Sequence, residues 1–192
     1  MNIIYFGKPY SFTHVVSLRR FGNVNNFISK ESINEVIESV NNKPGSIGVV
    51  PIENTTGGTI FDTVDILTLP KYLNSDLTII EELELHPRLF LLSKTKIPLV
   101  KIKAIYSHEF ALKRSELWAK KNISENIKLI SVASTSESIS RIKNNKYTCA
   151  IASEEAAGYY KLVKLHEIKA GGKKYLTRFF VIGKNEKTNK KI

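Results

Sequence analysis

The sequence is poor in cysteine and has no long apolar stretch. Cys149 is the single cysteine, so no disulfide can form within the chain, and its apolar neighbours indicate a small buried side chain rather than a nucleophile. No apolar run approaches the length of a membrane-spanning helix, and the first twelve residues lack the basic and apolar regions of an export signal. We therefore expect a cytoplasmic protein that does not associate with membranes.

Several common binding motifs are also missing. The sequence contains neither a phosphate-binding loop nor G-x-G-x-x-G. Its two His-Glu pairs lack the second histidine of a zinc-binding helix, so we expect no metal. The formal charge is +11, but the basic residues are scattered and are not grouped with aromatic ones, which argues against a nucleic-acid partner. A positive field does suit an anionic small molecule.

The 192 residues alternate short apolar runs with amphipathic segments, a pattern that predicts an α/β fold with mainly parallel sheets. The S-x-x-E spacing of Ser32 and Glu35 predicts a capped helix, and a second such box begins at Ser134. Residues 184–192 read as a frayed basic tail. The predicted strands are 1–6, 47–50, 77–80, 89–92, 102–106, 128–132, 149–153, 162–168 and 175–183, and the other predicted helices are 61–69 and 110–122. A polar link at 84–88 and the glycine pair at 171–172 are candidate crossings between lobes.

Four polar segments stand where strands are predicted to begin or end, which is where α/β proteins place their ligands. They are residues 53–58, Ser107-His108, Ser134-Thr135 and Thr177-Arg178. Helix capping explains Ser134 and Thr135 equally well. An arginine fork suits a carboxylate and an adjacent hydroxyl can donate to a leaving oxygen, whereas the structural alternative for Arg178 is an edge-strand salt bridge.

Five segments together resemble the catalytic domain of the prephenate dehydratase family. They are GVVPIENTTGGTIFDTVDIL (48–67), YSH (106–108), STSESISRI (134–142), AIASEEAAGYY (150–160) and LTRFFVIG (176–183). The resemblance implies one catalytic domain of two α/β lobes, like type II periplasmic binding proteins, with the active site in the cleft between lobes. Lobe 1 would span about 1–78 plus a C-terminal return, and lobe 2 about 79–170. The chain ends soon after the T-R-F strand, so no regulatory ACT domain is expected.

The resemblance also implies an activity. Members convert prephenate, a dicarboxylate, to phenylpyruvate by losing carbon dioxide and water without a cofactor, a step of phenylalanine biosynthesis. By this resemblance Thr177 assists departure of the ring hydroxyl, Arg178 holds the pyruvyl carboxylate, and a homo-oligomer such as a dimer is expected. The substrate contacts carried over are Asn54, Thr55, Ser107, His108, Thr135 and Phe179.

The chain departs from the family pattern at several positions. Tyr10 replaces a glycine, Glu109-Phe110 replaces Pro-Gln after Ser-His, Tyr175 replaces an asparagine, and Arg114 replaces a glutamine. Arg114 is either a specificity residue for an anionic substrate or a solvated surface residue. Arogenate dehydratase, prephenate decarboxylase and a non-catalytic small-molecule-binding module are the alternative functions.

Overall fold

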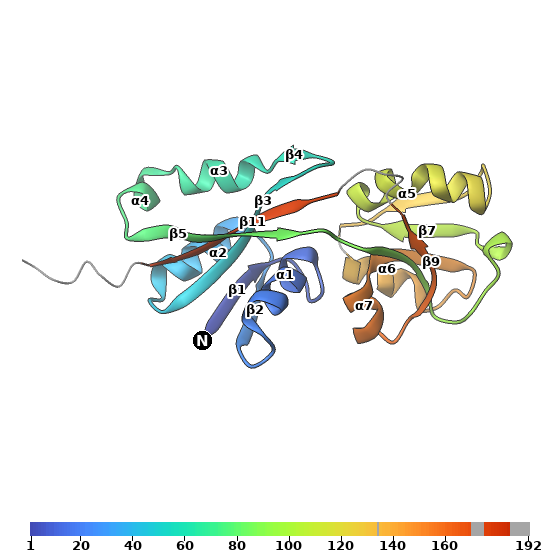
Figure 1. Cartoon of the computed structure of the whole chain (residues 1–192), viewed down its shortest axis with the longest axis horizontal. Helices are drawn as coiled ribbons and strands as arrows, with labels where there is room; N and C mark the ends of the chain where they lie inside the picture. The colour runs from blue at the N-terminus through green and yellow to red at the C-terminus, as the bar shows by residue number, and fades with distance from the viewer. Residues whose placement is uncertain (134, 170–174, 185–192) are drawn as a thin grey trace, which may run out of the picture. The chain divides into compact units, whose positions relative to one another are not determined.

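The computed structural model describes residues 1–133, 135–169 and 175–184. The chain divides into two compact units: unit 1 is Met1–His86 with Tyr175–Ile192, and unit 2 is Pro87–Lys174 (Figure 1). The first boundary lies later than the expected 78/79, because strand β5 (Leu77–Leu85) runs its full length beside β11 (Thr177–Lys184) in unit 1. Within the described ranges, no helix is both long and apolar enough to cross a membrane.

Unit 1 contains a mixed sheet in the order β2-β1-β3-β11-β5, with β4 paired to β3. The remaining strands are β1 (Asn2–Phe6), β2 (Asn26–Lys30), β3 (Ser46–Asn54) and β4 (Gly58–Thr59). Strand β1 is parallel to β2 and β3, whereas β11 is antiparallel to both β3 and β5. The last residues of β3 and of β5 therefore lie beside the first residues of the central strand β11.

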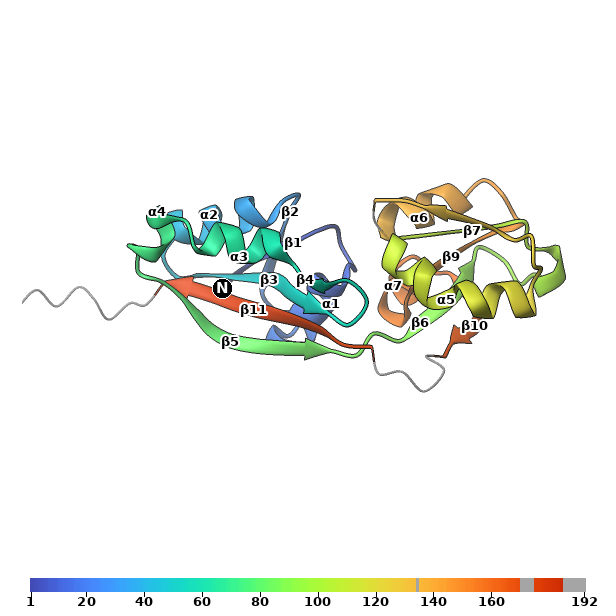
Figure 2. The same ribbon diagram turned by 90° about the horizontal axis from the view of Figure 1, so that it is seen from above.

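Helices cover both faces of this sheet (Figure 2). Helix α1 (Phe12–Phe21) packs Val15 and Val16 against one face, together with Phe179. Helices α2 (Ile33–Asn42), α3 (Phe61–Leu67) and α4 (Pro70–Leu73) pack on the other face. The predicted cap of α2 is confirmed, since Ser32 Oγ accepts the Glu35 N–H at 3.1 Å.

Unit 2 contains a second mixed sheet in the order β10-β6-β9-β7-β8. Strands β7 and β8 run parallel to their neighbours, whereas β6 is antiparallel to β9 and β10. Helices α5 and α6 lie on opposite sides of the sheet (Figure 2), and α7 packs on β9 and β6. The elements are β6 (Leu89–Ser93), β7 (Ala104–Ser107), β8 (Lys128–Ser131), β9 (Thr148–Ser153), β10 (Val163–Ile168), α5 (Glu109–Asn122), α6 (Thr135–Ile142), α7 (Glu154–Tyr159) and the 3-10 turn η1 (Leu99–Lys101).

The predicted α/β class is confirmed, with a correction to the strand directions. Both sheets are mixed rather than mainly parallel, because β11 returns between β3 and β5, and β6 lies between β9 and β10. The buried position predicted for Cys149 is also confirmed. Its side chain is fully enclosed in β9, and burial raises the pKa of its thiol to about 12. The predicted glycine joint at 171–172 and residues 185–192 of the tail lie outside the described residues.

Candidate active site

A β-bulge in β3 determines which residues at the end of β3 pair with the first residues of β11. Arg178 pairs with Glu53, but the next residue, Phe179, pairs with Pro51, so Ile52 is the extra residue of β3. This shift places Asn54 directly opposite Thr177, and Leu85 of β5 lies opposite Thr177 on its other side. The polar ends of two segments that are distant in the sequence are thus joined by backbone pairing.

The loop after β3 is fixed to the start of β11 by hydrogen bonds. The Thr55 N–H donates to the Leu176 carbonyl at 3.0 Å, and the Leu176 N–H donates to Thr55 Oγ1 at 3.2 Å. Asn54 Oδ1 accepts the N–H groups of Thr56 at 3.0 Å and Gly57 at 2.6 Å, which closes a tight turn. Asn54 and Thr55 are therefore held beside β11, and the Asn54 amide nitrogen keeps its two donor hydrogens for other partners.

Thr177 is half-buried at the first position of β11. Successive residues of a strand point to opposite faces of the sheet. Because Phe179 and Val181 pack on the α1 face, Thr177 belongs to that face, and Arg178 belongs to the opposite one. The two residues that the sequence grouped as the chemical pair thus leave the strand in opposite directions.

Arg178 is surrounded by carboxylates of the two neighbouring strands. Its Nη1 lies 3.5 Å from Glu53 Oε2, and its Nε lies 3.4 Å from Glu82 Oε1 and 3.5 Å from Glu84 Oε1. All four side chains are about half exposed. These contacts correspond to the salt-bridge alternative, although Arg178 lies on a central strand and not on an edge.

Phe179 requires a correction. The sequence placed it among the substrate contacts, but its side chain is only 1% exposed. It lies in the core under α1 with Val15 and Val49. A ring enclosed on all sides by the core cannot contact a ligand, so we remove Phe179 from the substrate-binding set.

Ser107 and His108 lie at the junction of β7 and α5 in unit 2. Ser107 is buried, and its hydroxyl donates to the Ile151 carbonyl at 2.6 Å, which ties β7 to β9. His108 is the N-cap of α5, where its Nδ1 lies 3.4 Å from the Phe110 N–H that it accepts. Desolvation lowers the pKa of His108, and the smaller effect of the Glu109 carboxylate, which raises it, does not cancel this shift. Because Nδ1 accepts the Phe110 N–H, the neutral form of this imidazole carries its proton on Nε2.

Two other predicted residues also belong to unit 2. Thr135 is the first residue of α6, but its side chain and Ser134 lie outside the described part of the structure. Arg114 on α5 is half-buried, and its Nη1 donates to the Pro87 carbonyl at 2.8 Å. The alternative that Arg114 is a solvated surface residue is therefore wrong. Its anchor lies at the first residue of unit 2.

The sequence did not single out His14, although the structure gives it a defined role in the loop between β1 and α1. His14 is buried, stacks on Tyr5 with ring centroids 4.4 Å apart, and accepts the Tyr10 N–H on Nδ1 at 2.9 Å. Burial lowers its pKa. Tyr10 has a φ of 62°, the left-handed conformation that glycine adopts most easily, so the glycine that the resemblance led us to expect here would suit the same turn. The tyrosine in place of an expected glycine at position 10 marked this loop in the sequence, but no sequence pattern pointed to His14.

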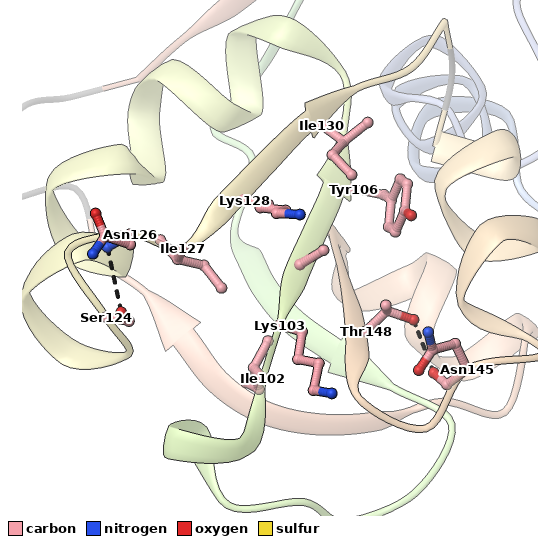
Figure 3. Close-up of a pocket in the computed structure, with 11 residues that line it drawn as sticks. Ile102, Lys103, Tyr106, Ser124, Asn126, Ile127, Lys128, Ile130, Asn145 and Thr148 are labelled. Atoms are coloured by element: carbon pink, nitrogen blue, oxygen red, sulfur yellow. Dashed lines mark hydrogen bonds between the residues drawn. The ribbon is translucent and has the colours of Figure 1, made fainter.

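A cavity of about 550 Å³ lies on unit 2, beside strand β7 and the outer strand β8 (Figure 3). Its lining includes Tyr106, Lys103 and Lys128, with apolar contributions from Ile127 and Ile130. Among the described residues, none of those predicted for the active site lines this cavity. Within the same part of the chain, no group of three or more His, Cys, Asp or Glu side chains is arranged to hold a metal ion.

The model of the family described as Prephenate dehydratase matches residues 3–187. The chain is 32% identical over 188 residues to the bifunctional chorismate mutase/prephenate dehydratase of Pseudomonas aeruginosa, covering 97% of this chain and 49% of that protein. It is 35% identical over 160 residues to the prephenate dehydratase of Methanocaldococcus jannaschii, covering 81% and 54%. The chain thus spans about half the length of these curated relatives. The prephenate dehydratase crystal structure from Staphylococcus aureus superposes with a TM-score of 0.80 at 26% identity, covering 97% of this chain and 67% of that one.

Proposed function

The chain belongs to the prephenate dehydratase family, and from that premise we propose that it converts prephenate to phenylpyruvate. In this reaction the bond from the ring to its carboxylate breaks and releases carbon dioxide. The electron pair of that bond enters the ring as the C–O bond of the ring hydroxyl breaks, and the departing hydroxide takes up a proton to become water. Because the product ring is aromatic, the protein needs only to orient the substrate and stabilise the leaving oxygen.

The observation that carries this proposal is the pairing of Thr177 with Asn54 at the bulged end of β3. A threonine hydroxyl is a weak acid, so its contribution is a hydrogen bond that strengthens as negative charge develops on the leaving oxygen. The Asn54 amide adds a second donor at the same rung of the sheet. Thr55 supports both through its two hydrogen bonds to Leu176.

The hydrogen bonds of the predicted residues in unit 2 limit what each of them can do in the reaction. Ser107 is only 2% exposed and its hydroxyl donates to the Ile151 carbonyl, so we assign it the role of holding β7 beside β9 and not a direct substrate contact. His108 offers its Nε2–H as a donor, and Thr135 remains a predicted substrate contact. Arg114 is the candidate that selects among prephenate, arogenate and related anions.

The alternative functions differ in whether they need a hydrogen-bond donor at Thr177. A prephenate decarboxylase retains the ring hydroxyl and has no use for a donor to the leaving oxygen, and a non-catalytic binding module needs no such donor either. An arogenate dehydratase has the same need as a prephenate dehydratase, so only a comparison of the two substrates separates them. The position of Thr177 beside Asn54 favours dehydration.

We further propose that the protein is cytoplasmic and forms a homo-oligomer, such as a dimer. Ile79 and Ile80, both on the outer strand β5, are 51% and 57% exposed, which is apolar surface that a second copy could cover. Sedimentation velocity tests this point. A dimer that dissociates on changing Ile80 to Lys supports it, and a monomer at all concentrations contradicts it.

The proposed chemistry is tested at Thr177 by removing the hydroxyl without changing the shape. Thr177→Val should lower kcat on the order of 10²-fold or more with little change in KM, because the hydrogen bond acts at the transition state. Thr177→Ser is the matched control and should retain most of the activity. If Thr177→Val turns prephenate over at the wild-type rate, the hydroxyl has no part in the reaction.

A further inference from the structure

Resting on this proposed function, we propose that Arg178 is a positioning residue that fixes Thr177 through the strands on either side, and not a clamp for a substrate carboxylate. The relevant cluster, called the arginine rung here, consists of Arg178, Glu53, Glu82 and Glu84. The argument comes from its register, its charge and the face of the sheet on which it lies.

The register places a carboxylate on both sides of Arg178. Glu53 of β3 and Glu84 of β5 are its direct partners across the two neighbouring strands, and Glu82 lies two pairs further along, opposite Phe180. The guanidinium lies 3.4–3.5 Å from an oxygen of each. Without the bulge at Ile52, Arg178 would face Ile52 instead of Glu53, so the same irregularity that pairs Asn54 with Thr177 also completes the arginine rung.

The charge of the arginine rung opposes a clamp. One guanidinium faces three carboxylates, so the cluster as a whole is negative. A substrate carboxylate that reached Arg178 would replace existing ion pairs and would meet the remaining glutamates as like charges. An arginine that serves as an anion receptor requires the reverse arrangement, in which its donors face the ligand without competing acceptors.

The face of the sheet points to the same conclusion. Arg178 and Thr177 are adjacent in the strand, so their side chains project to opposite faces. Thr177 shares the α1 face with Phe179, whereas the arginine rung lies on the other face. One substrate could be held by both side chains only around the end of the strand, whereas coupling through the backbone requires no such reach.

The positioning effect follows from this adjacency. The arginine rung bridges β3, β11 and β5 one residue away from the rung in which Thr177 pairs with Asn54 and Leu85. Removing the guanidinium would leave three like charges on β3 and β5, and their repulsion would loosen the strand ends that hold Thr177. The hydroxyl would then spend less time aligned with the leaving oxygen, which lowers kcat more than substrate binding.

The test compares Arg178→Gln with the triple variant Arg178→Gln/Glu82→Gln/Glu84→Gln, in which Glu53 is the one remaining charge of the arginine rung. We expect Arg178→Gln to lower kcat about tenfold with KM changed less than about twofold. It should also lower Tm by about 2–4 °C, the shift expected for a chain of this size on losing a modest interaction. The triple variant should recover most of both losses, because a single remaining carboxylate has no like charge of the rung to repel. A KM that rises tenfold or more and stays high in the triple variant would establish a clamp and overturn the proposal.

Arg20→Gln is the matched control. Arg20 of α1 donates from Nε to both oxygens of Glu81, each at 2.9 Å, and Glu81 lies on β5 like Glu82 and Glu84. Arg20 has no predicted part in the reaction. It should lower Tm without changing kcat, and an equal loss of kcat in Arg20→Gln would reduce the Arg178 effect to general destabilisation and refute positioning. If the wild type does not turn prephenate over at all, the proposed function fails. The Tm series then still decides whether the glutamates and Arg178 act as one rung.

Discussion

Replacement of Phe179 separates a core residue from a substrate contact. Its ring is 1% exposed among Val15, Val49 and Val181, so Phe179→Ala removes buried apolar surface and opens a cavity under α1. Such changes destabilise proteins by about 3–5 kcal/mol. Against a total unfolding free energy of about 5–15 kcal/mol, that is a large fraction, and it corresponds to a fall in Tm of about 6–20 °C.

Urea unfolding followed by circular dichroism measures this loss, and steady-state kinetics on the same samples measures KM. Phe179→Leu is the matched control, because it retains most of the apolar volume and should lose less than about 2 kcal/mol. At temperatures where both variants are folded, KM should stay near the wild-type value. A loss of stability below 1 kcal/mol accompanied by a raised KM for Phe179→Ala would show that the ring contacts substrate, contrary to its burial.

Three further predictions concern residues that the structure places in defined surroundings. Burial lowers the pKa of His14, so the unfolding free energy should be steady above the usual value near pH 6.5 and should fall as the pH drops below it, as the unfolded chain takes up the proton first; His14→Phe should flatten this slope in acid titrations of stability. Cys149, with a thiol pKa raised to about 12, should resist iodoacetamide at pH 8 in the native state and react only after denaturation, and fast native labelling would contradict its burial. Arg114→Gln should change the ratio of kcat/KM for prephenate and arogenate; an unchanged ratio with a lowered Tm would leave Arg114 only its bond to the Pro87 carbonyl.

Local patterns in the sequence predicted most of the regular elements, and the misses have physical reasons. No bounds were predicted for helix α1, because Thr13, His14 and Ser17 are buried polar residues that interrupt its apolar period. Strand β5 was predicted to end at residue 80, since its glutamates resemble a solvated link. In the folded chain β5 continues to Leu85, and Glu82 and Glu84 face Arg178.

The end of β3 shows the same limit of local reasoning. Pro51 was taken as the residue that closes the strand, because proline cannot donate to a ladder. The strand instead continues to Asn54, since Pro51 lies beside the bulge and beyond the residues that pair with β1. Strand β2, a half-exposed outer strand that begins with an asparagine, offered too weak an alternation to be predicted.

For the candidate active site, the motifs marked four segments but not the residues with which each segment pairs. The pairing of Thr177 with Asn54 depends on two strands that are far apart in the sequence and on one bulged residue, and no local pattern encodes either. The same is true of Arg178, whose three carboxylate partners come from two other strands. The predicted burial of Cys149 succeeded because it needed only the apolar run around that residue.

The central claim is that the protein dehydrates prephenate, and the most direct test measures phenylpyruvate and carbon dioxide released from prephenate by the purified wild-type protein, against the spontaneous rate without protein. The account predicts that both products form together, in equal amounts, well above the spontaneous rate. Carbon dioxide without phenylpyruvate would identify a decarboxylase that keeps the ring hydroxyl. Release of both products at no more than the spontaneous rate would contradict the claim that this chain catalyses the reaction.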